Sequence, residues 1–366
     1  MNSPTQLKIL SAVWRNPGLS RSELGELAGL HVNTMTRTVD ALIRKGYLRE
    51  GASGQSGVRG RPKIPLEVDP ARTCVGGIAI AAGGVEAVAM NLLGQPQGEA
   101  EKVAASNSAG IAKAVSRLLG GLLPKNPLAL GVSVTGFVDP VSRRILWSSA
   151  APAAELDLAP LLARAGETPV ALNSEIHALG MRWLMKHVEA EHDDTLVVTL
   201  EDGAVGASML IAGRPNRGCV LGGNELGHMS LNIETARCYC GGVGCVERVF
   251  CTDFLHRLGG RGSLGEAFAE PALSAPARQI IDLVALGVAN ATVFARPHRV
   301  VVAGMPAHNA RFRDALERAW RRRLPAVFRE RVTLSWYETK ATLSAETSGW
   351  LAIASVLSGS DGRAWT

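Results

Sequence analysis

Three cysteines stand within eight residues of one another in the stretch CYCGGVGC, and thiolates in such a pattern are typical metal ligands. They are Cys238, Cys240 and Cys245. The intervening glycines allow a short loop to bring the three sulfur atoms around one point. Zinc takes four Cys or His ligands in a tetrahedron, and the candidates for the fourth are His228, ten residues upstream, and Cys251.

Nothing in this stretch is typical of a site that activates water, so the pattern predicts a structural zinc site rather than a catalytic one. A reduced loop without metal is the alternative. The 366-residue chain has six cysteines, no apolar run of membrane-spanning length and no N-terminal secretory pattern. These features predict a cytoplasmic protein without a membrane partner, whose cysteines are thiols or metal ligands.

The positive charge of the chain is concentrated at its N-terminus. Residues 1–63 contain ten Lys and Arg against four Asp and Glu, which equals the whole net charge of +6. The remaining residues are balanced, with 29 basic and 29 acidic side chains. A basic head on a neutral body predicts that the head binds a polyanion and that the body has another task.

The pattern of the head indicates a helix-turn-helix. Apolar residues recur at helical spacing over 5–15, and Ser20 with Glu23 forms a capping box for a second helix that Gly29 can end. A third helix follows, with Val32, Met35, Val39, Leu42 and Ile43 on one face. Its opposite face carries Asn, Thr and Arg, which are side chains that contact bases and phosphates.

Two strand-like segments then flank a Gly/Ser-rich loop, which is typical of the wing in a winged helix. The expected DNA-binding residues lie on the helices and on this wing. They are Arg21, Asn33, Thr34, Thr36, Arg37, Arg59, Arg61 and Lys63. The alternative is a small helical domain that docks another protein and has a solvated basic surface. Beyond residue 68, strands alternate with helices, which predicts an α/β body.

The stretch ELGHMSLN…CYCGGVGCVE resembles the signature of the ROK family, named for repressors, open reading frames and kinases. The matching positions are Glu225, Gly227, His228, Cys238, Cys240, Gly241, Gly244, Cys245 and Glu247. The resemblance extends over essentially the whole chain. It implies a winged helix at 1–68 and two actin/hexokinase-like (ribonuclease H-like) α/β lobes at 69–185 and 186–366, with a sugar bound in the cleft between the lobes.

The resemblance also assigns roles to residues. It implies that His228 completes the zinc site with the three cysteines, and that Glu225, His228, Glu247 and Asn173 lie at sugar hydroxyls. Zinc would then hold the loop of Glu247 against the turn of Glu225. A metal-bound histidine keeps one ring nitrogen free to donate to a sugar oxygen.

The three elements that ROK kinases use for phosphoryl transfer are altered here. The acidic position of the first hairpin is Ala79, and the position of the catalytic Asp is Ser174. Glu201 and Asp202 occupy the third element, where they would repel phosphate. A serine hydroxyl does not accept a proton near pH 7 as a carboxylate does, so we expect no enzymatic activity. Ser174 can still exchange one hydrogen bond with a sugar.

Together these features predict a transcriptional regulator, expected to be a repressor, that binds a palindromic DNA operator as a homodimer or homotetramer. Its effector is expected to be a sugar or a sugar derivative. Two alternatives remain open: a sugar kinase with an appended DNA-binding head, and a regulator controlled by a protein partner. Another small molecule is a further option for the effector.

Overall fold

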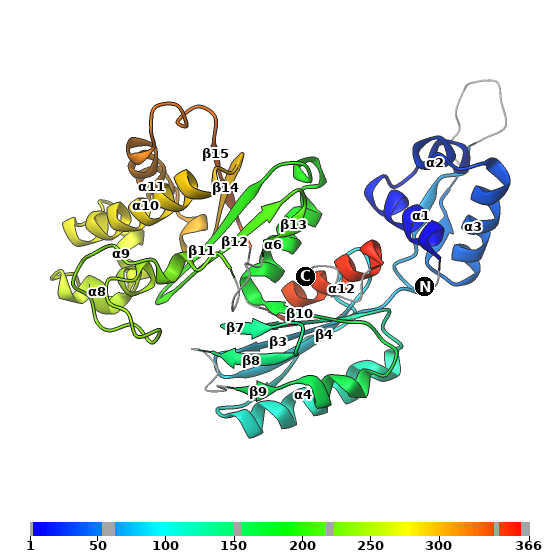
Figure 1. The fold of residues 1–366 in the computed structure, drawn as a ribbon, viewed down its shortest axis with the longest axis horizontal. Coiled ribbons are helices and arrows are strands. Elements are labelled where there is room, and N and C mark those ends of the chain that lie inside the picture. The colour runs from blue at the N-terminus through cyan, green and yellow to red at the C-terminus, as the bar shows by residue number, and fades with distance from the viewer. Residues whose placement is uncertain (1–2, 53–62, 149–154, 217–222, 340–343, 360–366) are drawn as a thin grey trace. The chain divides into compact units, whose positions relative to one another are not determined.

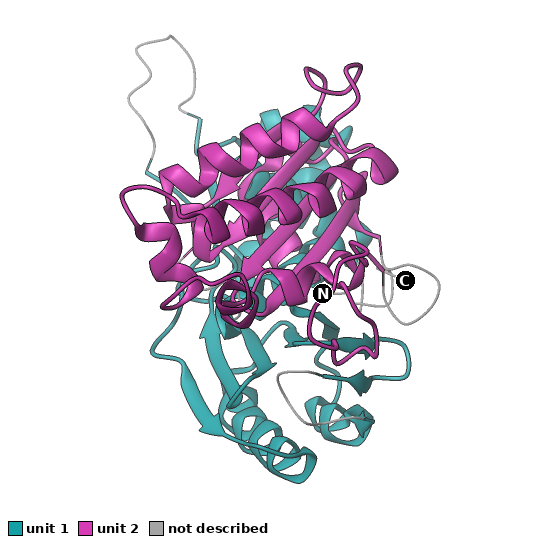
Figure 2. Cartoon of the chain, turned by 90° about the vertical axis from the view of Figure 1, so that its left-hand side faces the viewer, with its two compact units in different colours: residues 1–175, 344–366 teal, residues 176–343 magenta. Residues whose placement is uncertain are grey.

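The computed structural model describes residues 3–52, 63–148, 155–216, 223–339 and 344–359. The chain divides into two compact units, which Figure 2 shows in teal and magenta. The first unit combines residues 1–175 with residues 344–366, and the second unit comprises residues 176–343. The first unit therefore contains both ends of the chain.

The head consists of three helices and a two-stranded sheet, coloured blue in Figure 1. Its elements are α1 (Pro4–Arg15), α2 (Arg21–Ala28), α3 (Val32–Arg44), β1 (Leu48–Glu50) and β2 (Leu66–Val68). The predicted capping box is present, since the Ser20 side chain accepts from the Glu23 amide and Glu23 accepts from the Ser20 amide. Gly29 ends α2 in the left-handed conformation, with φ of 62°. The two strands pair antiparallel, as expected for the base of a wing.

The buried face of α3 is narrower than the sequence predicts. Met35, Val39 and Leu42 are buried, whereas Ile43 is only half-buried. The assignment of Val32 to this face is wrong, because its side chain is 70% exposed. Val32 is the first residue of the helix, where the chain has just turned at His31, so it lies beyond the edge of the head's core.

The first lobe is built on a five-stranded mixed sheet with the order β10-β6-β3-β4-β5. These strands are β3 (Val75–Ala81), β4 (Gly84–Met90), β5 (Glu101–Ala104), β6 (Leu130–Val134) and β10 (Val170–Ser174). Apolar side chains of one sheet face pack against α4 (Ser108–Leu122). The other face is covered by α12 (Ala345–Ser358), drawn in red in Figure 1. A small sheet of β7 (Phe137–Asp139), β8 (Arg144–Trp147) and β9 (Leu156–Asp157) completes the lobe, with the short helix α5 (Ala159–Leu162).

The second unit repeats this plan with the strand order β13-β12-β11-β14-β15. The strands are β11 (Thr195–Glu201), β12 (Ala204–Ile211), β13 (Arg214–Pro215), β14 (Arg299–Gly304) and β15 (Thr333–Tyr337). Alternate residues of β11 and β12 enter a core formed with α10 (Ala275–Ala295) and α11 (Ala310–Arg323). On the opposite face, Gly206 and Ser208 contact α6 (Glu175–Lys186). Both sheets combine an antiparallel hairpin with parallel strands, so the prediction of an α/β body is confirmed.

Helix α10 is long and apolar enough to cross a membrane, judged by length and composition alone. Its side chains Ile280, Ile281, Val284 and Val288 are nevertheless buried in the core of the second unit. Half of its most apolar window is buried in this way. Such burial is what a core helix of a packed α/β lobe requires.

The boundaries of the lobes differ from the expected 69–185 and 186–366. The division falls between Glu175 and Ile176, and residues 344–366 belong to the first unit. The physical reason is close packing of α12 on the first sheet, where Gly77 and Gly131 leave room for its backbone. A side chain at either glycine would collide with carbonyl oxygens of α12. The final helix therefore completes the first lobe, although it is last in the sequence.

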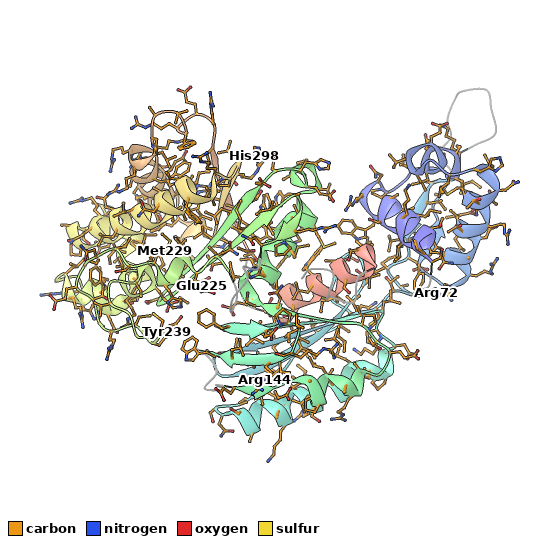
Figure 3. All side chains as sticks on the ribbon, in the orientation of Figure 1. Arg72, Arg144, Glu225, Met229, Tyr239 and His298 are labelled. Atoms are coloured by element: carbon orange, nitrogen blue, oxygen red, sulfur yellow. The ribbon has the colours of Figure 1, made fainter. Side chains whose placement is uncertain are left out.

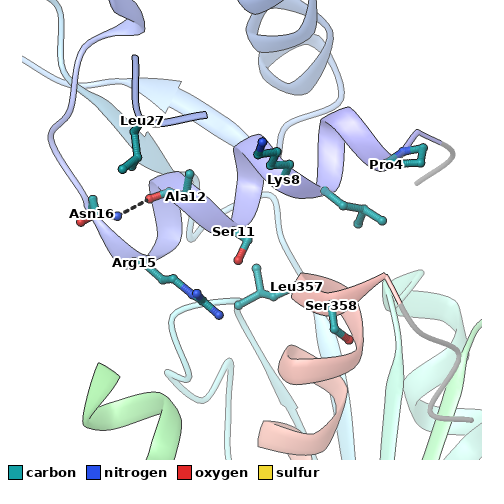
Figure 4. A pocket seen from close by; sticks show the side chains of 10 residues that line it. Pro4, Lys8, Ser11, Ala12, Arg15, Asn16, Leu27, Leu357 and Ser358 are labelled. Atoms are coloured by element: carbon teal, nitrogen blue, oxygen red, sulfur yellow. Dashed lines mark hydrogen bonds between the residues drawn. The ribbon is translucent and has the colours of Figure 1, made fainter. Parts of the chain in front are cut away.

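Helix α12 also contacts the N-terminal head. Helix α1 packs against it, and the Trp14 indole Nε1 donates a hydrogen bond of 2.7 Å to the Leu92 carbonyl of the first lobe. Figure 4 shows the open hollow between the two helices, where Ser11 and Arg15 of α1 line one side and Leu357 and Ser358 of α12 line the other. The head is thus seated on the lobe through its first helix.

Candidate metal centre and nucleic-acid interface

The turn that carries Glu225 and His228 is held close to the second sheet. It contains a short 3-10 helix, Leu226–His228. Gly227 lies against the Val205 carbonyl of β12, and a Cβ atom there would collide with it. Glycine at this position therefore allows the turn to approach the strand, which fixes the positions of Glu225 and His228 near it.

The structure brings together all four predicted metal ligands. One ligand atom from each of His228, Cys238, Cys240 and Cys245 lies within 4.8 Å of the others. Cys240 Sγ is 3.6 Å from Cys245 Sγ, and Cys238 Sγ is 3.7 Å from His228 Nδ1. With Zn–S bonds of about 2.3 Å, a tetrahedral zinc ion separates its sulfur ligands by roughly 3.8 Å. The spacing of the donors therefore fits a tetrahedral ion, and this cluster can hold a metal.

Two of the three thiols have raised pKa values that favour the protonated form, and a bound cation would favour the thiolate instead. Burial and, after it, the neighbouring Cys240 raise the pKa of Cys245 to about 12. Burial also raises the pKa of Cys238. For Cys240, burial acts against ionisation, but hydrogen bonds from the Gly242 backbone and from the other thiols lower its pKa overall. A bound cation would displace the remaining protons, because metal coordination requires thiolates.

The sequence leaves Cys251 open as the fourth ligand, and the structure places it elsewhere. Its side chain is buried in the hydrophobic core of the second unit. The thiol donates to the Arg248 carbonyl at 3.2 Å. Within the described part of the chain, the clustered donors are His228 and the three cysteines of the loop, so the histidine is the fourth ligand that the geometry favours.

The carboxyl groups of Glu225 and Glu247 act on one another. Glu247 lies on the short helix α7 (Val246–Val249) and is only 4% exposed. Its Oε2 accepts from the Val205 amide at 3.3 Å, whereas its Oε1 is buried without a hydrogen-bond partner among the described residues. Loss of water around the Glu225 carboxyl and, after it, the Glu247 charge raise its pKa to about 7, although the residue as a whole is exposed. Burial raises the pKa of Glu247 as well.

Sequence reasoning missed Tyr239 at this site. The Tyr239 hydroxyl lies 3.2 Å from Nε2 of His228, and the two rings meet edge to face at 5.0 Å. Tyr239 and Glu225 are both labelled in Figure 3. The one available signal was the position of this aromatic residue between two expected ligands, Cys238 and Cys240.

The expected ligand residues of the first lobe lie at the end of β10. Asn173 is buried, and its Oδ1 accepts from the Ser174 amide at 2.9 Å. The adjoining Glu175 carboxylate accepts a hydrogen bond from the Thr135 hydroxyl. Residue 174 itself, at the position of the catalytic base in ROK kinases, is a serine and carries no carboxylate. His177 is buried in the second unit, with Nε2 3.3 Å from the Asn216 carbonyl.

The turn between β11 and β12, which would approach phosphate in a kinase, accepts hydrogen bonds that hold a neighbouring helix in place. Both Asp202 carboxylate oxygens accept from Thr252, one from its amide at 2.8 Å and one from its hydroxyl. Thr252 begins helix α8 (Thr252–Arg257), so Asp202 caps this helix. The carboxylate that would repel phosphate is therefore a structural part of the lobe.

The expected base-contacting residues lie together on the first half of α3. Asn33, Thr34 and Arg37 are exposed, and Thr36 is half-buried. His31 caps the helix, and its Nδ1 accepts from the Asn33 amide at 3.4 Å. An exposed polar face on the second helix of a helix-turn-helix is the arrangement that reads a major groove.

Two other expected DNA contacts already have acidic partners. Arg21 bonds Asp40 at 2.7 Å and Glu50 at 2.9 Å, and it thereby ties α2 to α3 and to β1. Lys63 bonds Glu23 at 2.7 Å. These pairs make both cations part of the head's own structure. The remaining wing residues, Arg59 and Arg61, lie outside the described residues.

The profile of the ROK family matches residues 76–355, which is most of the chain. The chain belongs to the ROK family. A second profile, that of the MarR family, matches residues 3–53 of the head. The fold expected from the sequence is therefore confirmed: an N-terminal helix-turn-helix is followed by the actin/hexokinase-like α/β body of the ROK family.

Curated relatives include regulators. A xylose repressor of Caldicellulosiruptor bescii is 25% identical over 66% of this chain and 62% of the repressor. The xylose repressor of Bacillus subtilis is 24% identical over 66% of this chain and 64% of its own length. The chain thus matches somewhat less than two thirds of either relative.

Solved structures share the fold. A ROK family transcriptional regulator, described as a homologue of the Escherichia coli MLC protein, covers 98% of this chain with a TM-score of 0.77 and 16% identity. A ROK family glucokinase from Streptomyces griseus covers 76% of this chain with a TM-score of 0.61 and 20% identity. At such identities the likeness concerns the fold alone.

Proposed function

We propose that this protein is a sequence-specific DNA-binding transcriptional repressor whose ROK body senses a sugar or a sugar derivative. The observation that carries the proposal is the combination of a winged helix-turn-helix with a ROK body in which Ser174 stands at the position of the catalytic base. The exposed Asn33, Thr34 and Arg37 support direct reading of base edges. The names of the curated relatives agree with this proposal.

The operator is expected to be a palindrome bound by a homodimer or by a dimer of dimers in the cytoplasm. One head would occupy each half-site, with centres about one helical turn apart or a multiple of it. Arg37 is the residue expected to contribute most to base reading. Arg21 and Lys63, which already pair with acids, are expected to position the head on phosphates instead.

The metal in this proposal is one structural zinc ion held by His228, Cys238, Cys240 and Cys245. Four protein donors close the tetrahedron and leave no position for a reactive water molecule. The ion would hold the loop before α7 against the turn of His228, and so would orient Glu225 and Glu247. These carboxyl groups are the expected partners of ligand hydroxyls.

The body is proposed to bind its ligand without phosphorylating it. Ser174 offers no carboxylate to accept a proton, and Asp202 is committed to capping α8. Asn173 and Ser174 are proposed as ligand contacts from the first lobe. Because the curated relatives are named for xylose, D-xylose is the first effector to test. Its effect must come from unequal affinity for the DNA-competent and DNA-incompetent states.

The proposal is tested by affinity selection of sheared genomic DNA with the purified full-length protein at about 150 mM salt, followed by sequencing. We expect a few sharp peaks that share a palindrome. Arg37→Ala should abolish these peaks. Arg144→Ala is the matched control, because Arg144 is an exposed arginine of the first lobe outside the head, and it should leave them unchanged.

Diffuse enrichment that disappears with salt would contradict sequence-specific binding. Sharp peaks that no sugar shifts, and that survive Glu225→Ala unchanged, would contradict the sugar-sensing part and favour control by a protein partner. Turnover of ATP with any hexose would contradict the absence of kinase activity.

A further inference from the structure

Tyr239 occupies an unusual place in the metal loop. It lies in the turn between the ligands Cys238 and Cys240, and its side chain is 41% exposed. Instead of extending into solvent, its hydroxyl reaches back to Nε2 of His228 at 3.2 Å. Its ring stands at 87° to the imidazole, edge to face. The side chain therefore covers the side of His228 that faces away from the thiol of Cys238.

The two nitrogens of His228 have different neighbours. Nδ1 lies 3.7 Å from Cys238 Sγ, on the side of the clustered thiols. When a metal occupies Nδ1, Nε2 carries the proton and must donate it to an acceptor. The Tyr239 oxygen is that acceptor in this structure. The tyrosine proton then remains available for a second partner.

That second partner is Glu247. The Glu247 carboxyl lies beside the turn of His228, with its Oε2 next to Gly227, and the Tyr239 side chain interacts with it. Glu247 Oε1 is nonetheless buried without a hydrogen-bond partner among the described residues. One hydroxyl thus accepts from an imidazole and interacts with a carboxyl that still has an unused oxygen atom.

A sugar hydroxyl has the same hydrogen-bonding capacity as this tyrosine hydroxyl, with one donor and two acceptor positions. We propose that Tyr239 is a specificity-determining residue whose hydroxyl holds, in the ligand-free protein, the position between His228 and Glu247 that a hydroxyl of the effector must take. This inference rests on the proposed sensing function and deepens it. The effector displaces the tyrosine hydroxyl, so ligands without a hydroxyl at that position do not bind.

The proposal has a consequence for affinity. Each binding event breaks the contacts of the Tyr239 hydroxyl before the ligand makes its own, and this lowers the observed affinity. Tyr239→Phe keeps the aromatic ring but removes the competing hydroxyl. We expect zinc-loaded Tyr239→Phe to bind D-xylose at least about fivefold more tightly than the wild type, which corresponds to one ordinary net hydrogen bond.

The experiment combines calorimetric titration of the zinc-loaded full-length protein with a measurement that needs no ligand. In protein labelled with 15N-histidine, the exchange of the His228 Nε2 proton with water is compared between wild type and Tyr239→Phe. We expect slow exchange in the wild type and fast exchange in the variant. Tyr337→Phe is the matched control, because it removes a tyrosine hydroxyl from β15 of the same unit, and it should change neither result.

Each outcome of the two measurements tests a different part of the proposal for Tyr239. Equal exchange in wild type and Tyr239→Phe would overturn the inference, since the hydroxyl would not hold His228. Altered exchange with unchanged or weaker xylose binding would also overturn it, because Tyr239 would then contact the ligand instead of competing with it. Altered exchange with no binding of D-xylose, D-glucose or N-acetyl-D-glucosamine by either protein would refute the proposed sugar sensing. The hydrogen bond between the Tyr239 hydroxyl and His228 Nε2 would still be supported by the exchange result.

Discussion

Two turns of the second unit contain acidic side chains, and they differ in how those side chains are satisfied. In the turn between β11 and β12, both oxygens of Asp202 accept hydrogen bonds from Thr252. Near the metal loop, Glu247 Oε1 is buried without a partner among the described residues, and Glu225 has a pKa raised to about 7. The Asp202 carboxylate is satisfied by the chain itself, whereas the Glu247 carboxyl keeps one oxygen without a partner among the described residues.

This difference separates a structural role from a binding role. Buried polar groups are normally hydrogen-bonded, and an exception calls for a ligand, an ion or water. The β11–β12 turn, where a kinase would hold phosphate, offers no such exception at Asp202. The metal loop offers four clustered donors and an unused carboxylate oxygen. Of these two turns, the one at the metal loop is therefore the better candidate for binding, which agrees with the proposal of a body that binds without phosphoryl transfer.

The largest expected effect comes from removing a metal ligand. Cys245→Ser should lower the metal content from about one ion per chain to nearly none. The melting temperature should fall by roughly 6–12 °C, since a loss of about 3 kcal/mol shifts a unit of this size by about 2–4 °C per kcal/mol. Elemental analysis and calorimetry measure both values. Cys251→Ser is the control that should keep the ion, and full metal content in Cys245→Ser would refute the ligand set.

The next prediction contrasts the two turns directly. Asp202→Ala should destabilise the protein by about 1 kcal/mol, because the Thr252 amide at the start of α8 loses its acceptor. Glu247→Gln should leave stability unchanged or raise it by up to about 1 kcal/mol, because it removes a buried carboxylate with an unused oxygen. Thermal unfolding of the metal-loaded proteins tests the signs. Equal destabilisation by both changes would remove the distinction between the turns.

The Glu225 carboxyl should make the stability of metal-depleted protein depend on pH. Its pKa is raised from 4.5 to about 7, first by loss of water around the group and then by Glu247. The folded state therefore binds this proton more tightly than the unfolded state, so the contribution of Glu225 to stability is fully present below pH 4.5 and is lost as the pH rises to about 7. Melting temperatures at pH 5 and pH 7.5 should differ less in Glu225→Gln. A bound cation would favour the carboxylate and reduce the dependence.

A similarly small effect is expected in the head, where the polar groups of the α2 capping box are satisfied. Ser20→Ala should cost about 1 kcal/mol. The Glu23 pKa is lowered to about 2, mainly by Lys63 and then by Ser20. Its contribution is present above pH 4.5 and is lost as the pH falls toward 2. Circular dichroism melts at pH 5 and pH 3 should show this loss in the wild type and not in Glu23→Gln.

Local features of the fold could be predicted from the sequence. The capping box needs only Ser20 and Glu23, three residues apart, and the left-handed end of α2 needs only Gly29. The three cysteines of the metal loop are also close in sequence, so spacing and residue type were sufficient to predict that they lie together. The fourth ligand was the exception, because the choice between His228 and Cys251 depends on how the loop folds back.

Interactions between distant segments could not be predicted. Arg21 is basic and lies in a basic head, but its partners Asp40 and Glu50 are 19 and 29 residues away. The periodicity of residues 345–358 indicates a buried helix without saying which sheet it covers. Tyr239 has no periodic pattern at all, and its role depends on a hydroxyl that reaches His228 across the loop.

The contact between α1 of the head and α12 has a consequence for the order of folding during synthesis. The head is formed by the first 68 residues and can fold as soon as they emerge, because its contacts are local. The helix on which α1 rests comes from residues 345–358, almost three hundred residues later. A ribosome-bound chain therefore presents a folded head before the first lobe can be completed. A chain whose synthesis stops before residue 345 would therefore contain a folded head without the helix against which α1 packs.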